Sequence, residues 1–439
     1  MADAPPPPPP ESSAMPRRLA LCMAALGAAG LSADCGPAAA RSAKRSAIDA
    51  LSLPGAATGA KPRPATYDVR TYGAQGDGSS DDTGAIHAAI AAATKAGGGR
   101  VLLPAGTYAI TGITLAAGVD LAGEGRDNTI LRFTPGSGNA VTVPPVGFNH
   151  LCGFQVAFAQ KQSSGAAIYL DKAFTITLDG LYVQGGRGGV QFAADGIVLH
   201  ESTAIFVRDF NIYDCRGDAV RVDGPGGNDA YFSDGIINLG QTASGAGVHL
   251  VDFTNGAFNM TDVDILVGEY SLLVENSNYL RFENTYFDSS IRGAVLESGH
   301  LMTFANCWFS NRPGPGLHIG GIRGCSVVGG QVVNCGGHGI YVTDGAQYVS
   351  LAAVQVIGNN TAGQGSDGIR IDGGAARVSV QGCMVGNDPA VFAGPGQKVG
   401  IYIAPDAGTP YALVGSMLFE NVQAPLVDHG QGGYVAGNL

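Results

Sequence analysis

The chain has few charged residues and few large, flexible side chains. Charged residues make up 14% of its 439 positions, and it contains one tryptophan and seven methionines. A disordered chain is excluded, because 45% of the residues are hydrophobic and need a core in which to be buried. The formal net charge of −11 argues against a protein that coats nucleic acid or an anionic membrane, although a local basic groove remains compatible with it.

Several motifs are also missing. The sequence has no Cys/His spacing typical of zinc sites, no glycine-rich loop opening a phosphate-binding helix, and no serine-centred elbow typical of esterases. We therefore expect no metal site and no cofactor. Glycine, in contrast, is abundant at 68 residues, which suits a fold built from short strands and tight turns.

The first 66 residues divide into three segments by composition. Residues 1–14 are a proline-rich extension, which forms neither a helix nor a sheet. Residues 15–40 match an export signal, with two arginines, an apolar run and a small-residue cleavage site in that order. Residues 41–66 lack apolar periodicity and are predicted to be a linker.

The apolar run at 19–31 is too short for the alternative interpretation, a membrane helix, which needs ~20 residues. We therefore predict that the mature chain is exported to the periplasm or the extracellular space without membrane insertion. Because the signal begins at Met15, that residue is an alternative to Met1 as the true start.

The folded domain is expected over residues 67–439, beginning with a short helix near 82–96. The segment 84–96 is rich in alanine and places apolar residues on one face. Asp81 and Asp82 stand before it, where carboxylates cap a helix and order its turn. We expect this helix to cover the N-terminal end of the fold.

After residue 104 the chain becomes a repeat of short strands with an alternating apolar pattern. One strand of each coil is expected to begin near Ile176, Ile205, Tyr231, Phe258, Leu280, Met302, Cys325, Val349 and Val378. A second strand follows in each coil, as in Val220-Arg221-Val222 and Ile340-Tyr341-Val342. One coil has too little apolar surface to fold alone, whereas stacked coils share a continuous core. The repeat predicts an all-β fold, a single-stranded parallel β-helix, or solenoid.

The cysteine positions argue against disulfides, although the chain is predicted to be exported. In the repeat register Cys215 and Cys335 share a column five coils apart, about 24 Å at ~4.8 Å per coil. Cys307 and Cys383 share another column three coils apart. We predict that most of the six cysteines after residue 40 are small buried core residues.

Residues 67–133 carry a family resemblance. The segments 68–78 (DVRTYGAQGDG), 81–83 (DDT), 98–108 (GGRVLLPAGTY) and 121–125 (LAGEG) resemble the opening of pectate-lyase-superfamily proteins related to rhamnogalacturonases and polygalacturonases. The resemblance implies a right-handed parallel β-helix and a carbohydrate substrate. It leaves the reaction open, because the superfamily includes hydrolases, lyases, epimerases and phage tailspike depolymerases.

The polygalacturonase pattern is only partly present. Ala194-Asp195-Gly196 and Gly217-Asp218-Ala219 resemble its first two motifs, and Gly337-His338-Gly339 resembles the third. His338 lies about five coils from Asp218, however, and the chain has no RIK triplet and no DPH signature of alginate epimerases.

Outward side chains of the second strands form stripes about 5 Å apart per coil, so residues distant in sequence meet on one face. This face combines carboxylates, imidazoles, tyrosines and guanidinium groups. The predicted catalytic residues are Asp195, Asp218, His338 and Asp367. The predicted substrate-binding residues are Arg221, His249, Tyr270, Glu275, Arg292, Glu297, His318, Tyr341 and Arg370.

Two chemistries fit these residues, and the first is favoured. Glycoside hydrolysis needs two carboxyl groups, which Asp195 and Asp218 on adjacent coils can supply. A lyase or epimerase acting on a uronate-containing glycan needs a base and cations instead, and a lyase can also require calcium. The aspartates before glycine or alanine can equally be structural, closing tight turns.

The expected partner is a polysaccharide or oligosaccharide, with no role for nucleic acid. A surface β-helix that only binds glycans is an alternative, as is a tailspike-like depolymerase, although the export signal argues against the latter. A homo-oligomer such as a trimer remains open.

Overall fold

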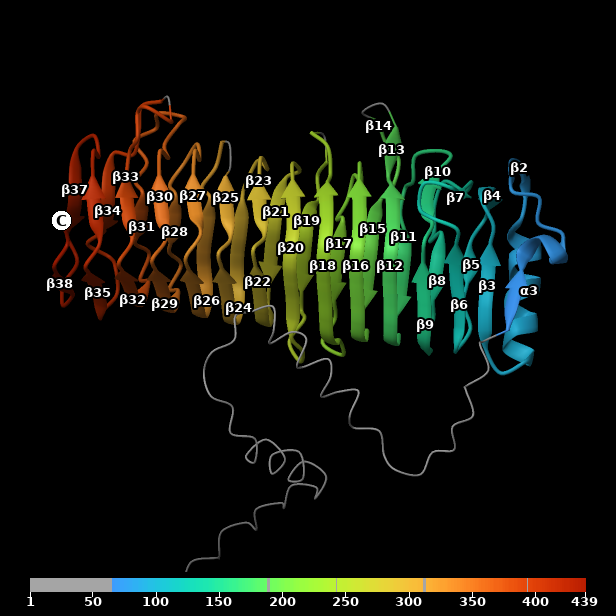
Figure 1. The fold of residues 1–439 in the computed structure, drawn as a ribbon. Helices are drawn as coiled ribbons and strands as arrows, with labels where there is room; N and C mark the ends of the chain where they lie inside the picture. The colour runs from blue at the N-terminus through green and yellow to red at the C-terminus, as the bar shows by residue number, and fades with distance from the viewer. Residues whose placement is uncertain (1–64, 188–189, 242, 311–312, 393) are drawn as a thin grey trace, which may run out of the picture. The chain divides into compact units, whose positions relative to one another are not determined.

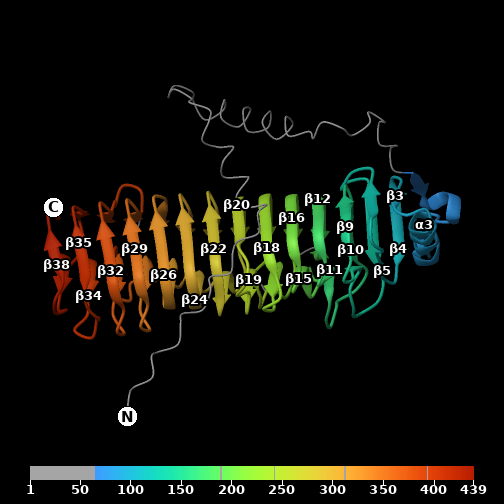
Figure 2. The same cartoon turned by 90° about the horizontal axis from the view of Figure 1, so that it is seen from below.

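The computed structural model describes residues 65–439, apart from 188–189, 242, 311–312 and 393. The predicted proline-rich extension, the export signal and almost all of the predicted linker fall in 1–64, outside the described residues. The described residues wind into coils stacked along one axis (Figures 1 and 2). The predicted right-handed parallel β-helix is confirmed.

The N-terminal end is covered as predicted. Strand β1 (Thr66–Asp68), the 3₁₀ helix η1 (Val69–Tyr72), strand β2 (Asp77–Asp81) and helix α3 (Thr83–Lys95) precede the regular coils. Ile86 and Ile90 of α3 are buried against the core, which shields the first coil from pairing with other chains. Within the described residues, no helix is long and apolar enough to cross a membrane.

The two aspartates before α3 have the two predicted roles, capping the helix and ordering its turn, but each has only one of them. The Oδ1 of Asp81 accepts a hydrogen bond from the Thr83 backbone N–H at 3.0 Å, in the first turn of the helix. Asp82 is buried and accepts from the backbone N–H groups of Gln75 and Gly76 instead, at 2.6 and 3.1 Å. Asp81 thus serves the helix end, while Asp82 orders the loop before it.

Three parallel sheets form the walls of the solenoid. Sheet 1 consists of β5 (Ile113–Thr114), β8 (Val141–Val143), β11 (Ala166–Asp171), β15 (Asp195–His200), β17 (Val220–Asp223), β19 (Ala246–Val251), β21 (Tyr270–Glu275), the first parts of β24 (Ala294–Ala305) and β26 (Leu317–Val328), β28 (Ile340–Val342), β31 (Ile369–Ile371), β34 (Val399–Ile403) and β37 (Ala424–Asp428).

Sheet 2 begins at β1 and carries the second parts of β24 and β26. Its other strands are β3 (Gly99–Leu103), β6 (Val119–Gly123), β9 (Gly147–Cys152), the first parts of β12 (Phe174–Gln184), β16 (Thr203–Tyr213), β18 (Asn228–Asn238) and β20 (Phe258–Leu266), then β22 (Ser277–Glu283), β29 (Gln347–Ala352), β32 (Ala376–Gln381), β35 (Tyr411–Val414) and β38 (Tyr434–Ala436).

Sheet 3 begins at β2 and takes the second parts of β12, β16, β18 and β20. Its other strands are β4 (Gly106–Ile110), β7 (Thr129–Phe133), β10 (Gln155–Phe158), β23 (Tyr286–Asp288), β25 (Trp308–Ser310), β27 (Gln331–Val333), β30 (Gln355–Ile357), β33 (Met384–Gly386) and β36 (Met417–Phe419). A short antiparallel hairpin, β13 (Gly186–Arg187) with β14 (Val190–Gln191), projects from one coil.

The predicted register holds with one local difference. The first-strand positions pair from coil to coil as expected, except that Ala230, not Tyr231, stands opposite Ile205 and Phe258. The small Ala230 is buried, and Tyr231 faces outward. Both alanine and tyrosine can point into a core, so the sequence pattern does not decide between these two neighbours. Packing against the adjacent coils places the smaller one inward.

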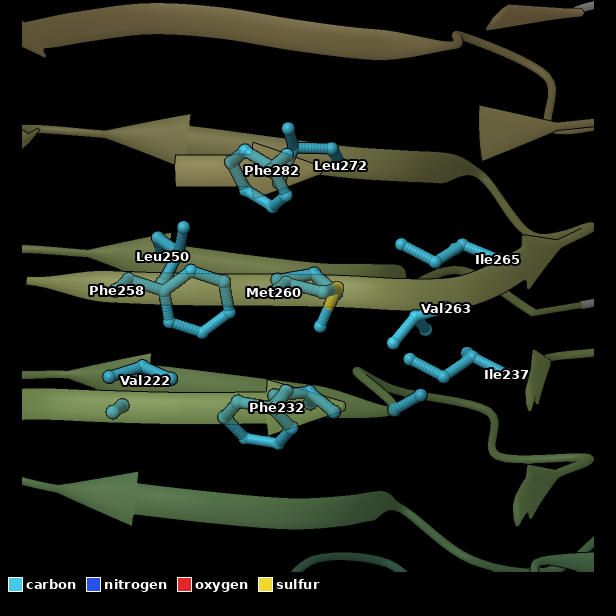
Figure 3. Close-up of a cluster of buried hydrophobic side chains, with 14 of the residues drawn as sticks. Val222, Phe232, Ile237, Leu250, Phe258, Met260, Val263, Ile265, Leu272 and Phe282 are labelled. Atoms are coloured by element: carbon cyan, nitrogen blue, oxygen red, sulfur yellow. The ribbon is translucent and has the colours of Figure 1, made fainter. Parts of the chain in front are cut away.

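The core is a column of apolar rings and aliphatic side chains (Figure 3). The rings of Phe232, Phe258, Phe282 and Phe304 follow one another at centroid distances of 5.4, 5.6 and 5.0 Å. Such contacts between adjacent coils bury what one coil alone leaves exposed.

The cysteines contribute to the same core. Cys215, Cys307, Cys325, Cys335 and Cys383 are buried, and Cys152 is half-buried. Cys152, Cys215, Cys307, Cys325 and Cys383 are free thiols. The prediction that most of the six cysteines are small core residues is confirmed.

Candidate functional site

The outward columns predicted on the second strands exist on sheet 1. Arg221 pairs with His249, and the column continues through the next four coils to Arg370. The polar residues in and beside this column gather in two places. We call them the His200 cluster (Tyr169, Asp195, His200, Asp218, Arg221, Asp223, His249 and Glu275) and the His338 cluster (His318, His338, Tyr341, Asp367, Arg370, Asp372 and Tyr402).

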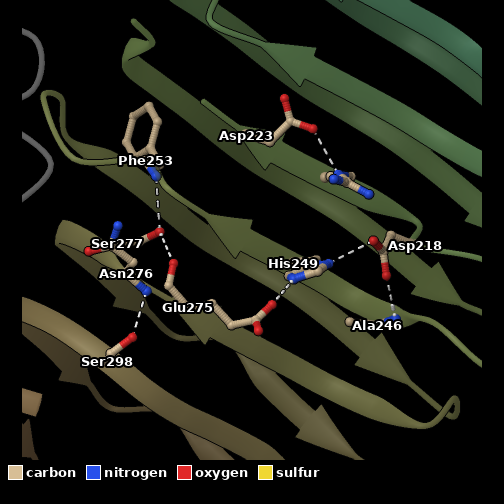
Figure 4. A network of polar contacts seen from close by, with 10 residues as sticks. Asp218, Asp223, Ala246, His249, Phe253, Glu275, Asn276, Ser277 and Ser298 are labelled. Carbon is tan, nitrogen blue, oxygen red and sulfur yellow. Dashed lines mark hydrogen bonds and ion pairs between the residues drawn. The ribbon is translucent and has the colours of Figure 1, made fainter. Parts of the chain in front are cut away.

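His249 of β19 links three adjacent coils in the His200 cluster (Figure 4). Its Nδ1 lies 2.8 Å from Oδ2 of Asp218, and its Nε2 lies 2.7 Å from Oε2 of Glu275. Burial acts to lower the pKa of His249, but the hydrogen bonds and charges of Asp218 and Glu275 outweigh it and raise the pKa. The imidazolium form is therefore favoured, and it holds the two carboxylates in fixed positions.

His200, at the end of β15, forms a second dyad in the same cluster. Its Nδ1 lies 2.6 Å from Oδ1 of Asp223, and its ring stacks on Tyr169 with centroids 6.4 Å apart and planes inclined by 14°. The contact with Asp223 fixes the ring and uses Nδ1. Because 35% of the His200 side chain is exposed, Nε2 is the nitrogen left to exchange a proton with a bound molecule.

Arg221 is the second side chain that contacts Asp223. Its Nε donates to Oδ2 of Asp223 at 2.8 Å, so Asp223 holds the guanidinium with one oxygen and His200 with the other. The two terminal nitrogens of Arg221 remain as a fork suited to a carboxylate. Burial raises the pKa of Tyr169, so its hydroxyl stays a proton donor at neutral pH.

Asp195 and Asp218, the predicted acid pair, lie on adjacent coils as expected and have backbone partners. The Oδ1 of Asp195 accepts from the Asp218 N–H at 3.0 Å, and the Oδ1 of Asp218 accepts from the Ala246 N–H at 2.8 Å. Asn139 bonds the Ala166 N–H in the same way two coils earlier, at 2.9 Å, so an uncharged amide can fill this position.

Asp195 is nevertheless an unusual carboxyl group. Burial and the nearby charge of Asp218 raise its pKa. Gly217 allows the close approach, since a Cβ at that residue would stand 2.1 Å from Oδ1 of Asp195. Both aspartates thus have a structural role, bonding backbone N–H groups of the next coil, and their catalytic role stays a prediction.

In the His338 cluster one guanidinium is shared by two carboxylates. Arg370 donates from Nε to Oδ2 of Asp372 at 2.7 Å and from a terminal nitrogen to Oδ2 of Asp367 at 3.3 Å, while its guanidinium packs on the Tyr402 ring at 4.7 Å. Asp367 is 2% exposed, and burial raises its pKa. This arrangement is typical of a structural ion network, in which the cation is already satisfied.

Two histidines flank Tyr341 in this cluster. The ring centroids of His318 and His338 lie 5.1 and 5.3 Å from that of Tyr341. The Nδ1 of His338 accepts from the Asp367 backbone N–H at 2.8 Å. Burial and the Arg370 charge lower the pKa of His338 to about 4, so it is neutral at physiological pH.

The predicted residues between the clusters are more exposed. Arg292 donates from Nε to Oε1 of Glu269 at 2.6 Å and stacks over the Tyr270 ring. Glu297 is exposed on β24. Arg221 and Arg370 are six pairing steps apart, about 29 Å at ~4.8 Å per step. The structure therefore places most of the predicted residues in two separate clusters on this face, leaves Tyr270, Arg292 and Glu297 between them, and does not join them in one site.

The sequence-based prediction missed His200 and Tyr169 as site residues. The predicted mid-strand column began at Arg221, whereas the register continues two coils further toward the N-terminus, through Val198 to Tyr169. Following the Asp223 column back by one coil leads directly to His200. The signal was present, but the coil that carries it is interrupted by the β13–β14 hairpin.

Among the described residues, no group of three or more His, Cys, Asp and Glu side chains is arranged to hold a metal ion. The expectation of no cofactor, and of calcium only for a lyase, stays a prediction.

Residues 66–341 match the sequence profile of the family described as rhamnogalacturonase A/epimerase, pectate lyase-like. The chain belongs to this family. The resemblance seen in the N-terminal motifs is thereby confirmed. The matched range takes in the whole His200 cluster, whereas Asp367, Arg370 and Asp372 lie beyond it.

Individual relatives match shorter parts. Mannuronan C5-epimerase AlgE2 of Azotobacter vinelandii is 44% identical over 84 residues, which are 17% of this chain and 8% of that protein. Alginate lyase 7 of the same organism is 42% identical over 78 residues, 16% of this chain and 9% of that protein. These matches span less than a tenth of either relative.

Among solved structures, the A-module of mannuronan C5-epimerase AlgE6 of Azotobacter vinelandii superposes with a TM-score of 0.62. The superposition covers 85% of this chain and 98% of that module at 18% identity. At this identity the likeness shows a shared fold.

Proposed function

We propose that the protein is an enzyme that removes the C5 proton of a uronate residue in an acidic polysaccharide, as a C5-epimerase or a polysaccharide lyase does. The observation that carries the proposal is the contact of Asp223 with both His200 and Arg221, beside the Tyr169 ring. Two sequence relatives named as a mannuronan C5-epimerase and an alginate lyase support it. Their matches cover small parts of the chain, so the activity rests on the site.

Each residue has a separate task in this chemistry. The guanidinium of Arg221 binds the uronate carboxylate, which makes the neighbouring C5–H bond more acidic. Nε2 of His200 takes the C5 proton, and the Asp223 carboxylate stabilises the imidazolium that forms. The electron pair released from the C5–H bond is delocalised into the carboxylate.

Two outcomes then balance the reaction. If a proton returns to C5 from the opposite face, the sugar is epimerised and no bond of the chain breaks. If the C4–O bond breaks instead, a 4,5-unsaturated uronate forms, and the leaving oxygen takes a proton. The protonated Tyr169 hydroxyl beside His200 is the donor available in either case. His249, Asp218 and Glu275 hold the adjoining coils in place.

Hydrolysis, which the sequence alone favoured, is a second candidate. The raised pKa of Asp195 is suited to a general acid, and Asp218 is the neighbouring carboxylate. Against it, one oxygen of Asp195 and both oxygens of Asp218 already accept hydrogen bonds from the protein. The remaining alternatives are a tailspike-like depolymerase and a β-helix that binds glycans without turnover.

Product analysis separates these functions. The protein, with and without calcium, is incubated with polymannuronate, polygalacturonate and a neutral β-glucan. New reducing ends, ultraviolet absorbance of the unsaturated uronate, and proton NMR of the sugar ring are measured. Epimerised or unsaturated uronate supports the proposal, saturated new reducing ends indicate hydrolysis, and no turnover of any glycan indicates a binding protein. Export to the periplasm or beyond is part of the proposal, because such polymers lie outside the cytoplasm.

A further inference from the structure

A second groove lies on sheet 2, on a different sheet from the His200 cluster. It has a cavity volume of about 760 Å³ and is lined by residues of β18, β20, β22, β24, β26 and β29, including Tyr231, Tyr279 and Tyr348. A further cavity of about 600 Å³ shares Tyr279, Leu301 and Tyr348 with it and adds Arg323. Because the two cavities share these lining residues, we call them together the sheet 2 groove.

Aromatic rings stand exposed along this groove. Tyr231, Tyr279 and Tyr348 are 38%, 50% and 48% exposed, and the Tyr231 ring stacks on Phe206 at 5.2 Å. Flat exposed rings offer apolar faces on which the CH faces of sugar rings stack, while the hydroxyl groups find polar partners. Asn228, Asn255 and Asn259 are such partners in the lining.

The backbone presents these side chains at some cost in energy. Tyr279, Leu301, Tyr348 and Arg377 occupy one column, with φ of 59°, 57°, 58° and 56°. Positive φ is uncommon for bulky residues, and the strain must be compensated elsewhere. Gly324 stands in the same column between Leu301 and Tyr348, and the Leu301 side chain packs against it.

Two guanidinium groups at one end of the groove, Arg323 in its lining and Arg377 beside it, have no carboxylate partners. Arg323 and Arg377 lie over the Tyr348 ring at 4.8 and 5.2 Å, and both donate to Oε1 of Gln347, at 3.0 and 3.3 Å. Within the described part of the chain, neither forms an ion pair. In a protein of net charge −11, two like charges held side by side by neutral groups indicate an anionic ligand.

The opposite end of the groove has the other polarity. Asp229, in the coil of Tyr231, is the one carboxylate among the described lining residues. A ligand that fits both ends carries an anionic group at the Arg323 end and hydroxyl groups at the Asp229 end. A chain of sugar rings with carboxylates meets this description, with one tyrosine at each end of the groove, Tyr231 and Tyr348, and Tyr279 between them.

We infer that the sheet 2 groove is a second binding site for an acidic polysaccharide, separate from the His200 cluster and used to hold the polymer against the solenoid. The inference adopts the ligand class of the proposed function, but it needs no turnover. Tyr348, with Arg323 and Arg377 over its ring, forms the cationic end of this site.

Binding is tested in a protein that carries His200→Ala, so that no substrate is consumed. The affinities for polygalacturonate and polymannuronate are measured by titration calorimetry at low and high salt, with neutral dextran for comparison. The double change R323Q/R377Q and the single change Tyr348→Ala are introduced separately. Arg208→Gln is the matched control, because Arg208 is exposed on sheet 2 and already paired with Asp179 at 2.9 Å.

We expect R323Q/R377Q and Tyr348→Ala each to raise the Kd for the acidic polymers at least tenfold, and Arg208→Gln to leave it unchanged. The double change should also flatten the salt dependence of binding. Equal Kd values for the parent and both groove variants overturn the inference. So does a shift from oligomer to monomer without loss of glycan affinity, because the groove would then be an interface between copies.

The two proposals fail separately. Absence of C5 chemistry in the unsubstituted enzyme, with Arg323-dependent binding intact, removes only the proposed function. Loss of Arg323 dependence with C5 chemistry intact removes only the second binding site. Thermal unfolding of each variant confirms that the altered side chains affect the surface and not the fold.

Discussion

The Nδ1 of His200 lies 2.6 Å from Oδ1 of Asp223, one coil further along the solenoid. The other oxygen of the same carboxylate holds Nε of Arg221. One aspartate therefore orients both the proposed base and the proposed carboxylate-binding group.

Replacing Asp223 by Asn tests this double role. We expect kcat to fall by roughly 10²- to 10⁴-fold, because the amide neither stabilises the His200 imidazolium nor holds Arg221 by charge. Asp252→Asn is the control, since Asp252 is an exposed turn residue bonded to Asn276. Initial rates on the best uronate polymer give the comparison, and equal losses in the two variants count against the site.

Replacing Asp195 by Asn separates proton abstraction from hydrolysis. An asparagine Oδ1 can still accept the Asp218 N–H, as Asn139 does for Ala166. The proposal therefore expects a modest loss of rate with the fold intact. Complete loss of turnover with unchanged thermal stability would show instead that Asp195 is the catalytic acid of a hydrolase.

Because of His249, we expect the free energy of unfolding to decrease as the pH rises above neutrality. Its pKa in the folded protein is raised by Asp218 and Glu275, so its contribution is fully present below the unfolded pKa of about 6.5 and is lost as the pH rises through the folded value. Denaturant unfolding from pH 6 to 9 measures this loss, and His249→Gln should flatten the curve. If the free energy of unfolding of His249→Gln falls with pH as steeply as that of the parent, other groups cause the decline.

For His338 we expect the opposite pH dependence, with the free energy of unfolding decreasing toward acid pH. Its folded pKa of about 4 lies below the unfolded value, so the unfolded chain binds the extra proton and stability falls as the pH drops from about 6.5 toward 4. The full shift corresponds to about 3 kcal/mol of unfolding free energy. His338→Asn keeps an acceptor near the Asp367 N–H without titrating. If the acid limb of the stability curve is unchanged in this variant, the assignment to His338 is wrong.

We expect the loss of the Arg370 guanidinium to lower the free energy of unfolding substantially. Arg370→Met leaves the buried Asp367 and Asp372 without their cation, which costs about 3–5 kcal/mol for a buried pair. Adding D367N and D372N to the same chain should recover much of the loss, as measured by chemical denaturation. Arg292→Met is the control, because Arg292 is mostly exposed and its loss should cost under 1 kcal/mol.

The fold could be predicted from the sequence to the level of register. The alternation around Val220 and Ile340 and the spacing of the coils define which residues are neighbours, because each coil must stack its apolar side chains on the next. The pairings confirm the predicted columns, including the five coils between Asp218 and His338.

The site was less predictable. Whether an aspartate bonds a backbone N–H or a substrate depends on side-chain rotamers, which periodicity does not determine. From periodicity alone, Asp218 and Asp367 were equally good catalytic candidates, although Asp218 turns toward Ala246 and His249 and Asp367 is buried beside Arg370. It placed Tyr231 inward, because only packing distinguishes it from Ala230. The sheet 2 groove depends on such outward rings and was not foreseen.

The most direct test of the account is hydrogen exchange at C5. The uronate polymer that binds best is incubated in D₂O with the enzyme and with its His200→Ala variant, and deuterium at C5 is measured by NMR together with product formation. We predict that the enzyme forms epimerised sugar carrying deuterium at C5, or a 4,5-unsaturated end, and that the variant forms neither. Saturated new chain ends with no deuterium at C5, or equal C5 chemistry in the variant, would contradict it.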